Sequence, residues 1–122
     1  MNAQLTSWYC PDIEDLTNYP PAQLDNFCFL FRVMVGLVGK EGTESFDIQV
    51  CTPKWLLSNM KKDEIICGRH FLIVLAYYFE PILNRIRNLI EACTGNDWDE
   101  IAEKVSRIGF WEFEDYKDTK NS

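Results

Sequence analysis

The spacing of hydrophobic residues along the chain predicts strands in its first half. Residues Gln4 to Tyr9 contain Leu5, Trp8 and Tyr9, which predicts a short first strand that Pro11 ends. Residues 27–38 (FCFLFRVMVGLV) are almost continuously apolar and rich in aromatic and β-branched side chains, as in a central strand. A turn at residues 39–42 (GKEG) separates this run from residues 46–50 (FDIQV), where apolar and polar residues alternate. We therefore expect an antiparallel hairpin with one wet face on its second strand.

A short helix is predicted directly after the hairpin. Thr52 followed by Pro53 is typical of a helix N-cap with proline at the first helical position. The helix should run from Pro53 to about Met60. Its inward residues should be Leu56 and Leu57, with Trp55 beside them.

The second half of the chain predicts one more long strand, two longer helices and a terminal strand. The strand should span about His70 to Tyr78. Pro81 should open a helix that Gly95 closes, with an apolar face made of Ile82, Ile86, Leu89, Ile90 and Cys93. Asp97 and Glu100 have the spacing of a capping box, and the helix they start should end at Gly109, with an apolar stripe made of Trp98, Ile101, Val105 and Ile108. Residues 110–116 should then form the last strand.

This order of elements predicts an α+β fold. We expect a mostly antiparallel sheet of four to five strands, with the two longer helices packed on one face and one short helix elsewhere. The chain of 122 residues has the length of one domain, residues 1–122. Residues 18–22 (NYPPA) should be a linker, and residues 117–122 a frayed polar tail.

Composition narrows the class of protein. Hydrophobic residues make up 47% of the chain and charged residues 25%, as in an ordinary globular protein. The longest apolar runs fall short of the roughly 20 residues that cross a bilayer. The N-terminus lacks the basic start and apolar block of a secretory signal. We therefore expect a cytoplasmic protein that has no membrane partner.

The five cysteines lead to the same expectation. They are spread along the chain without the C-x-x-C spacing of metal or redox sites. Free thiols in a reducing compartment are the simplest interpretation. Cys28 and Cys93 should behave as small buried hydrophobic residues.

The net charge of −7 is unevenly distributed. Residues 12–27 hold Asp12, Glu14, Asp15 and Asp25 with no Lys or Arg, a net −4. Residues 97–115 hold seven carboxylates against Lys104 and Arg107, a net −5. An acidic surface repels phosphate backbones, so nucleic acid is not an expected partner. The charge favours a basic protein partner, although an acidic surface also simply keeps a protein in solution.

Candidate catalytic chemistry is sparse. His70 is the only histidine, and no motif links it to a serine or cysteine nucleophile, so a structural role is expected. The glycines at residues 36–42 lack the arrangement of a phosphate-binding loop, and the paired carboxylates fit the solvent face of a strand better than an acid and base pair. No cofactor or metal is expected. An uncharacterised enzyme using His70 stays open, as does a small ligand-binding or adaptor domain with an aromatic pocket lined by Tyr77, Tyr78 and Trp98.

Several strings together resemble one known family. They are residues 7–16 (SWYCPDIEDL), 26–36 (NFCFLFRVMVG), 44–56 (ESFDIQVCTPKWL), 68–74 (GRHFLIV) and 111–116 (WEFEDY). They resemble the immunity protein 8 family of bacterial polymorphic-toxin and contact-dependent growth inhibition systems. The most specific parts are residues 50–56 and the closing WEF. The resemblance implies a small cytosolic protein without catalytic activity that binds and blocks one cognate toxin domain, in many such systems a nuclease.

The same resemblance gives meaning to the acidic segments. Nuclease domains tend to be basic, so an acidic inhibitor gains electrostatically steered capture, and our hypothesis is that acidic side chains occlude the toxin's substrate cleft directly. Trp111 and Phe113 should be core residues, since family-wide residues suit folding better than partner choice. By strand alternation Glu112 and Glu114 should share the opposite, wetter face. The candidate toxin-binding residues are Asp12, Glu14, Asp15, Glu112, Glu114 and Asp115.

Overall fold

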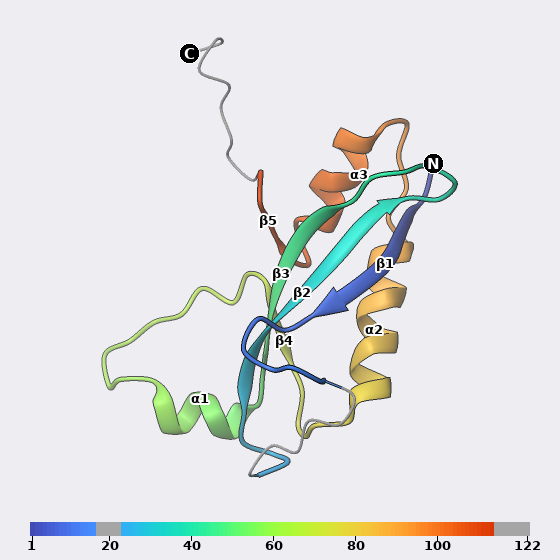
Figure 1. The fold of residues 1–122 in the computed structure, drawn as a ribbon. Coiled ribbons are helices and arrows are strands. Elements are labelled where there is room, and N and C mark those ends of the chain that lie inside the picture. The colour runs from blue at the N-terminus through green and yellow to red at the C-terminus, as the bar shows by residue number, and fades with distance from the viewer. Residues whose placement is uncertain (17–22, 114–122) are drawn as a thin grey trace.

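The computed structural model describes residues 1–16 and 23–113, and within them it forms an α+β fold (Figure 1). The elements in chain order are β1 (Ala3–Tyr9), β2 (Cys28–Leu37), β3 (Glu44–Cys51), α1 (Pro53–Asn59), β4 (Phe71–Ile73), α2 (Phe79–Glu91), α3 (Trp98–Val105) and β5 (Phe110–Trp111). The predicted fold class is confirmed. The predicted linker at residues 18–22 and the predicted tail at residues 117–122 lie outside the described residues.

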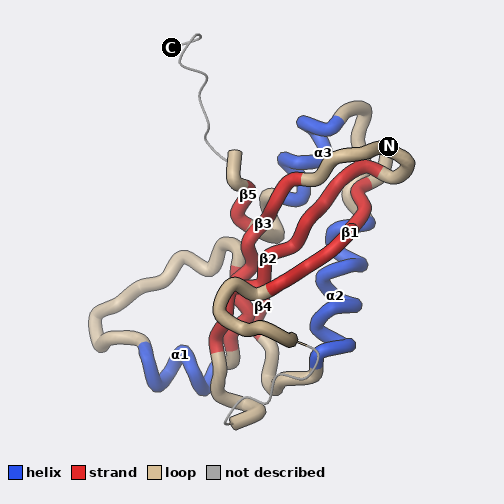
Figure 2. The backbone as a smooth tube through the Cα atoms, in the orientation of Figure 1, coloured by secondary structure: helices blue, strands red, loops and turns tan. Residues whose placement is uncertain are grey.

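The strands form one mixed, mostly antiparallel sheet (Figure 2). β1, β2 and β3 are antiparallel neighbours, and the predicted hairpin of β2 and β3 is confirmed. The far edge of β3 is shared by two short strands. β4 pairs with residues 49–51 in parallel, and β5 pairs with residues 46–47 in antiparallel orientation. The end of the chain thus closes the edge beside the start of β3.

One face of the sheet carries the core. Trp8, Val33, Phe46 and Trp111 are successive partners across β1, β2, β3 and β5, so their side chains share this face. Trp8 lies 6.5 Å from Phe79 of α2 between ring centroids, and Phe46 lies 6.3 Å from Trp98 of α3. Both longer helices therefore pack on the same face, as predicted, and the strands pass in front of them in Figure 1.

The outer edge of β1 is closed by groups from the end of α2. The Ala3 amide donates to the Cys93 carbonyl at 3.1 Å, and the Leu5 amide donates to the Glu91 carboxylate at 3.1 Å. An unsatisfied strand edge would invite pairing with another chain. Because Cys93 and Glu91 occupy these amides, β1 offers no such edge at residues 3–5.

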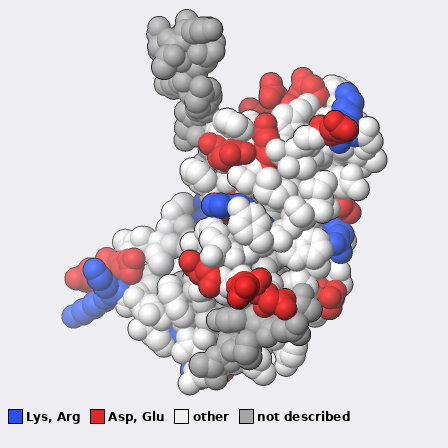
Figure 3. Space-filling model, viewed as in Figure 1, with Lys and Arg blue, Asp and Glu red and all other residues white. Residues whose placement is uncertain are grey.

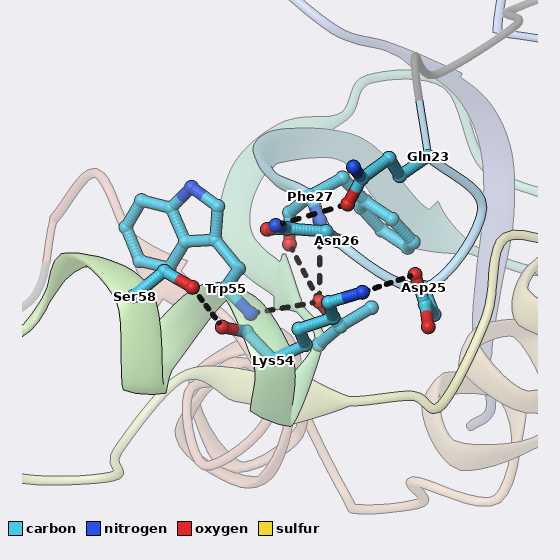
Figure 4. Close-up of polar contacts among 8 residues, drawn as sticks. Gln23, Asp25, Asn26, Phe27, Lys54, Trp55 and Ser58 are labelled. Carbon is cyan, nitrogen blue, oxygen red and sulfur yellow. Dashed lines mark hydrogen bonds and ion pairs between the residues drawn. The ribbon is translucent and has the colours of Figure 1, made fainter.

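The helix α1 begins where the sequence predicts it (Figure 4). The buried Thr52 hydroxyl accepts from the Trp55 amide at 3.2 Å and from the Phe27 amide at 3.1 Å. One side chain therefore caps α1 and holds the segment that leads into β2. The prediction that Leu57 faces inward is wrong, because its side chain is 86% exposed, and α1 contains no buried residue. Leu56 is only half-buried.

The predicted third long strand is also wrong. β4 contains only residues 71–73, since β3 offers it an edge only beside residues 49–51. His70, which should have begun the strand, has a φ of 68°, in the left-handed region outside the β range. Beyond β4 the chain turns toward the core, where Tyr77 is buried and its hydroxyl donates to the Leu16 carbonyl. The apolar run belongs to a short strand followed by a connection that buries Tyr77 and leaves Leu75 and Tyr78 exposed.

The predicted helices differ from the observed ones mainly at their ends. α2 begins at Phe79, so Pro81 is its third residue, and its buried residues include Ile82, Ile86 and Ile90. The Asp97 carboxylate caps α3 by accepting from the Glu100 amide at 2.9 Å, as predicted. α3 stops at Val105, short of the predicted end at Gly109. None of the helices in the described part of the chain is long and apolar enough to cross a membrane.

The cysteines depart from the prediction of five free thiols. Cys28 and Cys51 are direct partners across β2 and β3, with Cα atoms 4.1 Å apart, and the structure joins them in a disulfide. Spacing motifs could not show this, because the pair is created by strand register. Cys10 is buried and Cys93 half-buried, while Cys67 is exposed, and these three are free thiols.

Candidate interaction surface

The first predicted acidic segment forms an exposed loop after β1. A backbone hydrogen bond of 3.2 Å from Ile13 to Cys10 shapes the loop, and its ends are anchored by the buried side chains of Cys10 and Leu16. Asp12, Glu14 and Asp15 are all exposed. The structure therefore brings these three carboxylates together, facing solvent.

The second predicted acidic segment is described only in part. Glu112 follows β5 and is exposed, and its carboxylate accepts from the Ser45 amide at 3.1 Å. This contact extends the closure of the β3 edge by one residue. Glu114 and Asp115 lie outside the described residues.

The aromatic residues beside Glu112 divide between two environments. Trp111 stacks on Phe46 with centroids 6.1 Å apart, and its ring N–H donates to the Glu44 carboxylate at 2.6 Å. It is half-buried against the core, in agreement with the predicted core role. Phe113 is 41% exposed, so its predicted burial is wrong. β5 pairs over only two residues, and strand alternation therefore does not extend to position 113.

The acidic loop and Glu112 lie at different places along the sheet. The loop of residues 12–15 follows the end of β1, whereas Glu112 lies beside the start of β3. Figure 3 views the molecule from the side opposite α2 and α3. Acidic side chains gather above and below the middle of this face, and the middle is mostly uncharged around one basic patch.

The middle of the sheet carries a row of side chains that sequence reasoning missed. Tyr9, Arg32, Asp47 and Phe110 are successive partners across β1, β2, β3 and β5, on the face opposite the core. Tyr9 is 48% exposed and Phe110 is 50% exposed. We call these four residues, with the half-buried Leu30 and Met34 of β2, the open face.

Arg32 holds the centre of the open face in one conformation. Its guanidinium makes two hydrogen bonds to the Asp47 carboxylate, at 2.7 and 2.9 Å, and a third to the Tyr9 hydroxyl at 3.2 Å. The guanidinium carbon also lies 5.7 Å from the centre of the Tyr9 ring. The pKa of Arg32 is raised above its ordinary value, mainly by the hydrogen bond to Asp47 and next by the hydrogen bond to Tyr9. One signal for this site was present in the sequence, since Arg32 is the one charged residue in the apolar run 27–38.

The comparison with known families decides between the open alternatives. The model of the family described as Immunity protein 8 matches residues 3–116. The chain belongs to the immunity protein 8 family. Among curated proteins and solved structures, the chain has no match. Immunity proteins bind and neutralise a cognate toxin, and they are typically inhibitors without enzymatic activity.

The histidine of this immunity protein has a structural environment. The Nε2 atom of His70 lies 2.6 Å from the Ser106 carbonyl oxygen, so a proton on Nε2 is donated there. Its ring also packs edge-on against Phe110, with centroids 5.7 Å apart. These contacts fit the expected structural role and connect the end of α3 to the open face.

The aromatic pocket of the alternative interpretation does not form. Tyr77 is buried against Phe27 and Phe29 at the lower end of the sheet, and Tyr78 is exposed. Trp98 lies beside Phe46 at the other end, where it lines a hollow of about 270 Å³ under the β2–β3 turn. Among the described residues of the immunity protein, no group of three or more His, Cys, Asp or Glu side chains is placed to hold a metal ion.

Proposed function

We propose that this immunity protein neutralises a basic toxin domain, a nuclease, by stoichiometric binding in the cytoplasm. The toxin would be the C-terminal domain of a large modular protein in a contact-dependent inhibition or polymorphic-toxin system. Membership of the immunity protein 8 family supports toxin binding. The observation that carries the finer proposal is the exposed acidic loop of Asp12, Glu14 and Asp15 on a chain of net charge −7.

The acidic residues would act before and during contact. Clustered charges of one sign raise the rate at which an oppositely charged protein is captured, and rim charges affect the association rate more than the dissociation rate. A nuclease holds phosphate with Lys and Arg, so the same carboxylates would occupy its substrate cleft. Glu112, Glu114 and Asp115 are the second proposed contact segment.

Co-expression tests the proposal directly. The toxin domain encoded just upstream of the immunity gene should stop growth, and this chain should restore it. Purified, the two proteins should form a one-to-one complex. If the chain neither protects the cells nor binds that domain, the proposed function is wrong.

Charge variants test the acidic loop separately. The triple variant Asp12→Asn, Glu14→Gln, Asp15→Asn should lower the association rate roughly tenfold at low salt, with a weaker salt dependence. A matched control removes three carboxylates outside both acidic segments, through Asp63→Asn, Glu64→Gln and Glu80→Gln. If both triple variants lower the association rate equally, net charge and not the position of the loop determines the rate.

A further inference from the structure

We infer that the open face is the docking surface for the toxin domain, and that the carboxylates of Asp12, Glu14, Asp15 and Glu112 belong to the rim of this interface. The inference rests on the proposed function and deepens it. The partner it fits is a folded domain with an apolar centre surrounded by Lys and Arg.

The composition of the open face fits the centre of an interface. Tyr, Arg, Phe and Met are enriched in the buried centres of protein interfaces, and Tyr and Arg are common among residues that dominate binding energy. Tyr9 and Phe110 expose about half of their surface, and the half-buried Leu30 and Met34 flank Arg32 along β2. A partner that covers this row removes apolar surface from water.

The side chains of the open face already contact one another or their neighbours without a partner. Arg32 is fixed by two bonds to Asp47 and one to Tyr9, and Phe110 is held against the His70 ring. These side chains sit on paired strands. Binding therefore requires little ordering of side chains, which is a cost that weakens flexible interfaces. The Arg32 charge is also neutralised inside the molecule, so it does not repel a basic partner.

Charge complementarity identifies the occupant. Asp12, Glu14 and Asp15 lie in the loop that follows Tyr9 at the end of β1, and Glu112 lies two residues beyond Phe110 and contacts Ser45 of β3. Figure 3 shows acidic side chains above and below the middle of this face. A mostly uncharged centre, in which Arg32 and Asp47 pair with each other, lies between acidic side chains and matches a partner whose apolar contact area is bordered by Lys and Arg. A second copy of this chain would bring acidic side chains together in many orientations, which disfavours self-association.

Contacts already made at the edges of β1 and β3 favour docking of the toxin on the open face over addition of a partner strand at these edges. The amides of Ala3 and Leu5 on the β1 edge are occupied by the end of α2. The second edge of β3 is occupied by β4, β5 and the Glu112 carboxylate. A partner strand would have to displace these contacts before pairing with β1 or β3 there, whereas the open face needs no displacement.

The experiment measures binding of the upstream-encoded toxin domain, made inactive by mutation, to variants of the full chain. Tyr9→Ala and Phe110→Ala should each weaken the Kd at least tenfold, mainly through faster dissociation. The matched control is Tyr78→Ala, because Tyr78 is 61% exposed and is the residue directly before α2, off the open face. Thermal unfolding should confirm that all three variants fold, since each truncates a side chain that is about half exposed.

Oxidative footprinting of the unmodified chain gives a readout that needs no variant. Met34 lies on the open face and Met60 follows α1, and both are half-buried in the free protein. Toxin binding should slow oxidation of Met34 severalfold and leave Met60 unchanged.

The outcomes separate the two proposals. If the unmodified chain binds the toxin while the Tyr9 and Phe110 variants bind as Tyr78→Ala does, the open face is not the docking surface and the proposed function stands. If the same variants convert a dimer of the chain to a monomer without affecting the toxin Kd, the occupant is a second copy and the inference is overturned. If the unmodified chain does not bind that domain, both proposals fail together.

Discussion

Replacing Thr52 with valine removes a hydroxyl that connects three parts of the fold while leaving its shape nearly unchanged. Thr52 is fully buried, and its Oγ1 accepts from the Phe27 amide at 3.1 Å and from the Trp55 amide at 3.2 Å. It also lies 3.4 Å from the Phe27 carbonyl, to which it can donate. Thr52→Val leaves both amides without this acceptor. The predicted result is a large loss of stability from one oxygen atom.

The magnitude follows from the two orphaned amides. The Phe27 amide is buried with its residue, and an unsatisfied buried donor costs about 1–3 kcal/mol. Loss of the N-cap at Trp55 adds about 1 kcal/mol, since water reaches the exposed end of α1. The free energy of unfolding should therefore fall by about 2–4 kcal/mol. For a chain of 122 residues, 1 kcal/mol corresponds to about 4 °C, so the Tm should fall by about 8–16 °C.

The assay is denaturant unfolding followed by circular dichroism, with thermal melting as a second measure. Thr52→Ser is the matched control, because it keeps the hydroxyl and loses one methyl group at a cost of about 1 kcal/mol. Asp97→Ala removes the solvent-exposed cap of α3, and it should also cost about 1 kcal/mol. A Thr52→Val loss no larger than that of Thr52→Ser would refute the reasoning, because the hydrogen bonds would then contribute nothing beyond packing.

Two further predictions concern the β5 edge and the thiols. Trp111→Ala should cost about 2 kcal/mol in urea unfolding, below the 3–5 kcal/mol of a fully buried Trp, because the ring is half-buried. Trp111→Phe should keep the stacking on Phe46 and lose about 1 kcal/mol with the bond to Glu44, and equal losses for both variants would contradict this division. Thiol titration of the oxidised, denatured chain should count three thiols, rising to five after reduction, and five before reduction would contradict the disulfide. In the folded chain Cys67 should react first and Cys93 slowly, because burial raises the pKa of Cys93 and lowers its thiolate fraction.

Thiol titration also bears on the proposed cytoplasmic location. Disulfides form and persist mainly in oxidising compartments. If the chain isolated from cells under rapid alkylation carries five modified thiols, Cys28 and Cys51 are reduced there, as the proposed location requires. A persistent disulfide in that sample would argue against it.

The elements that the sequence predicts correctly are those determined by residues close to one another in the chain. β2 and β3 follow from apolar content and alternation, and Thr52 and Asp97 mark helix starts through contacts three residues ahead. The strand predicted at residues 70–78 failed because apolarity alone does not say whether a strand partner is available. β3 offered an edge for only three residues, and beyond them Tyr77 is buried while Leu75 is 79% exposed.

The same distinction applies to the candidate site. The carboxylates at residues 12–15 are neighbours in sequence, so charge counting finds them, and the structure exposes all three. Tyr9, Arg32, Asp47 and Phe110 come from four strands and meet only through the register of the finished sheet. The spacing of these residues in the sequence does not predict the strand register. The open face could therefore be identified only from the structure.

The alternation of core and open-face residues along β2 affects how the sequence of such a protein can evolve. Phe29, Phe31 and Val33 point into the core, while Leu30, Arg32 and Met34 alternate with them on the open face. A substitution at an open-face position alters what a partner meets and leaves the neighbouring core contacts in place. Under the proposed docking at the open face, folding and partner choice depend on alternating positions of one strand. A scaffold of this kind can acquire resistance to an altered toxin by single steps, each of which leaves the protein folded.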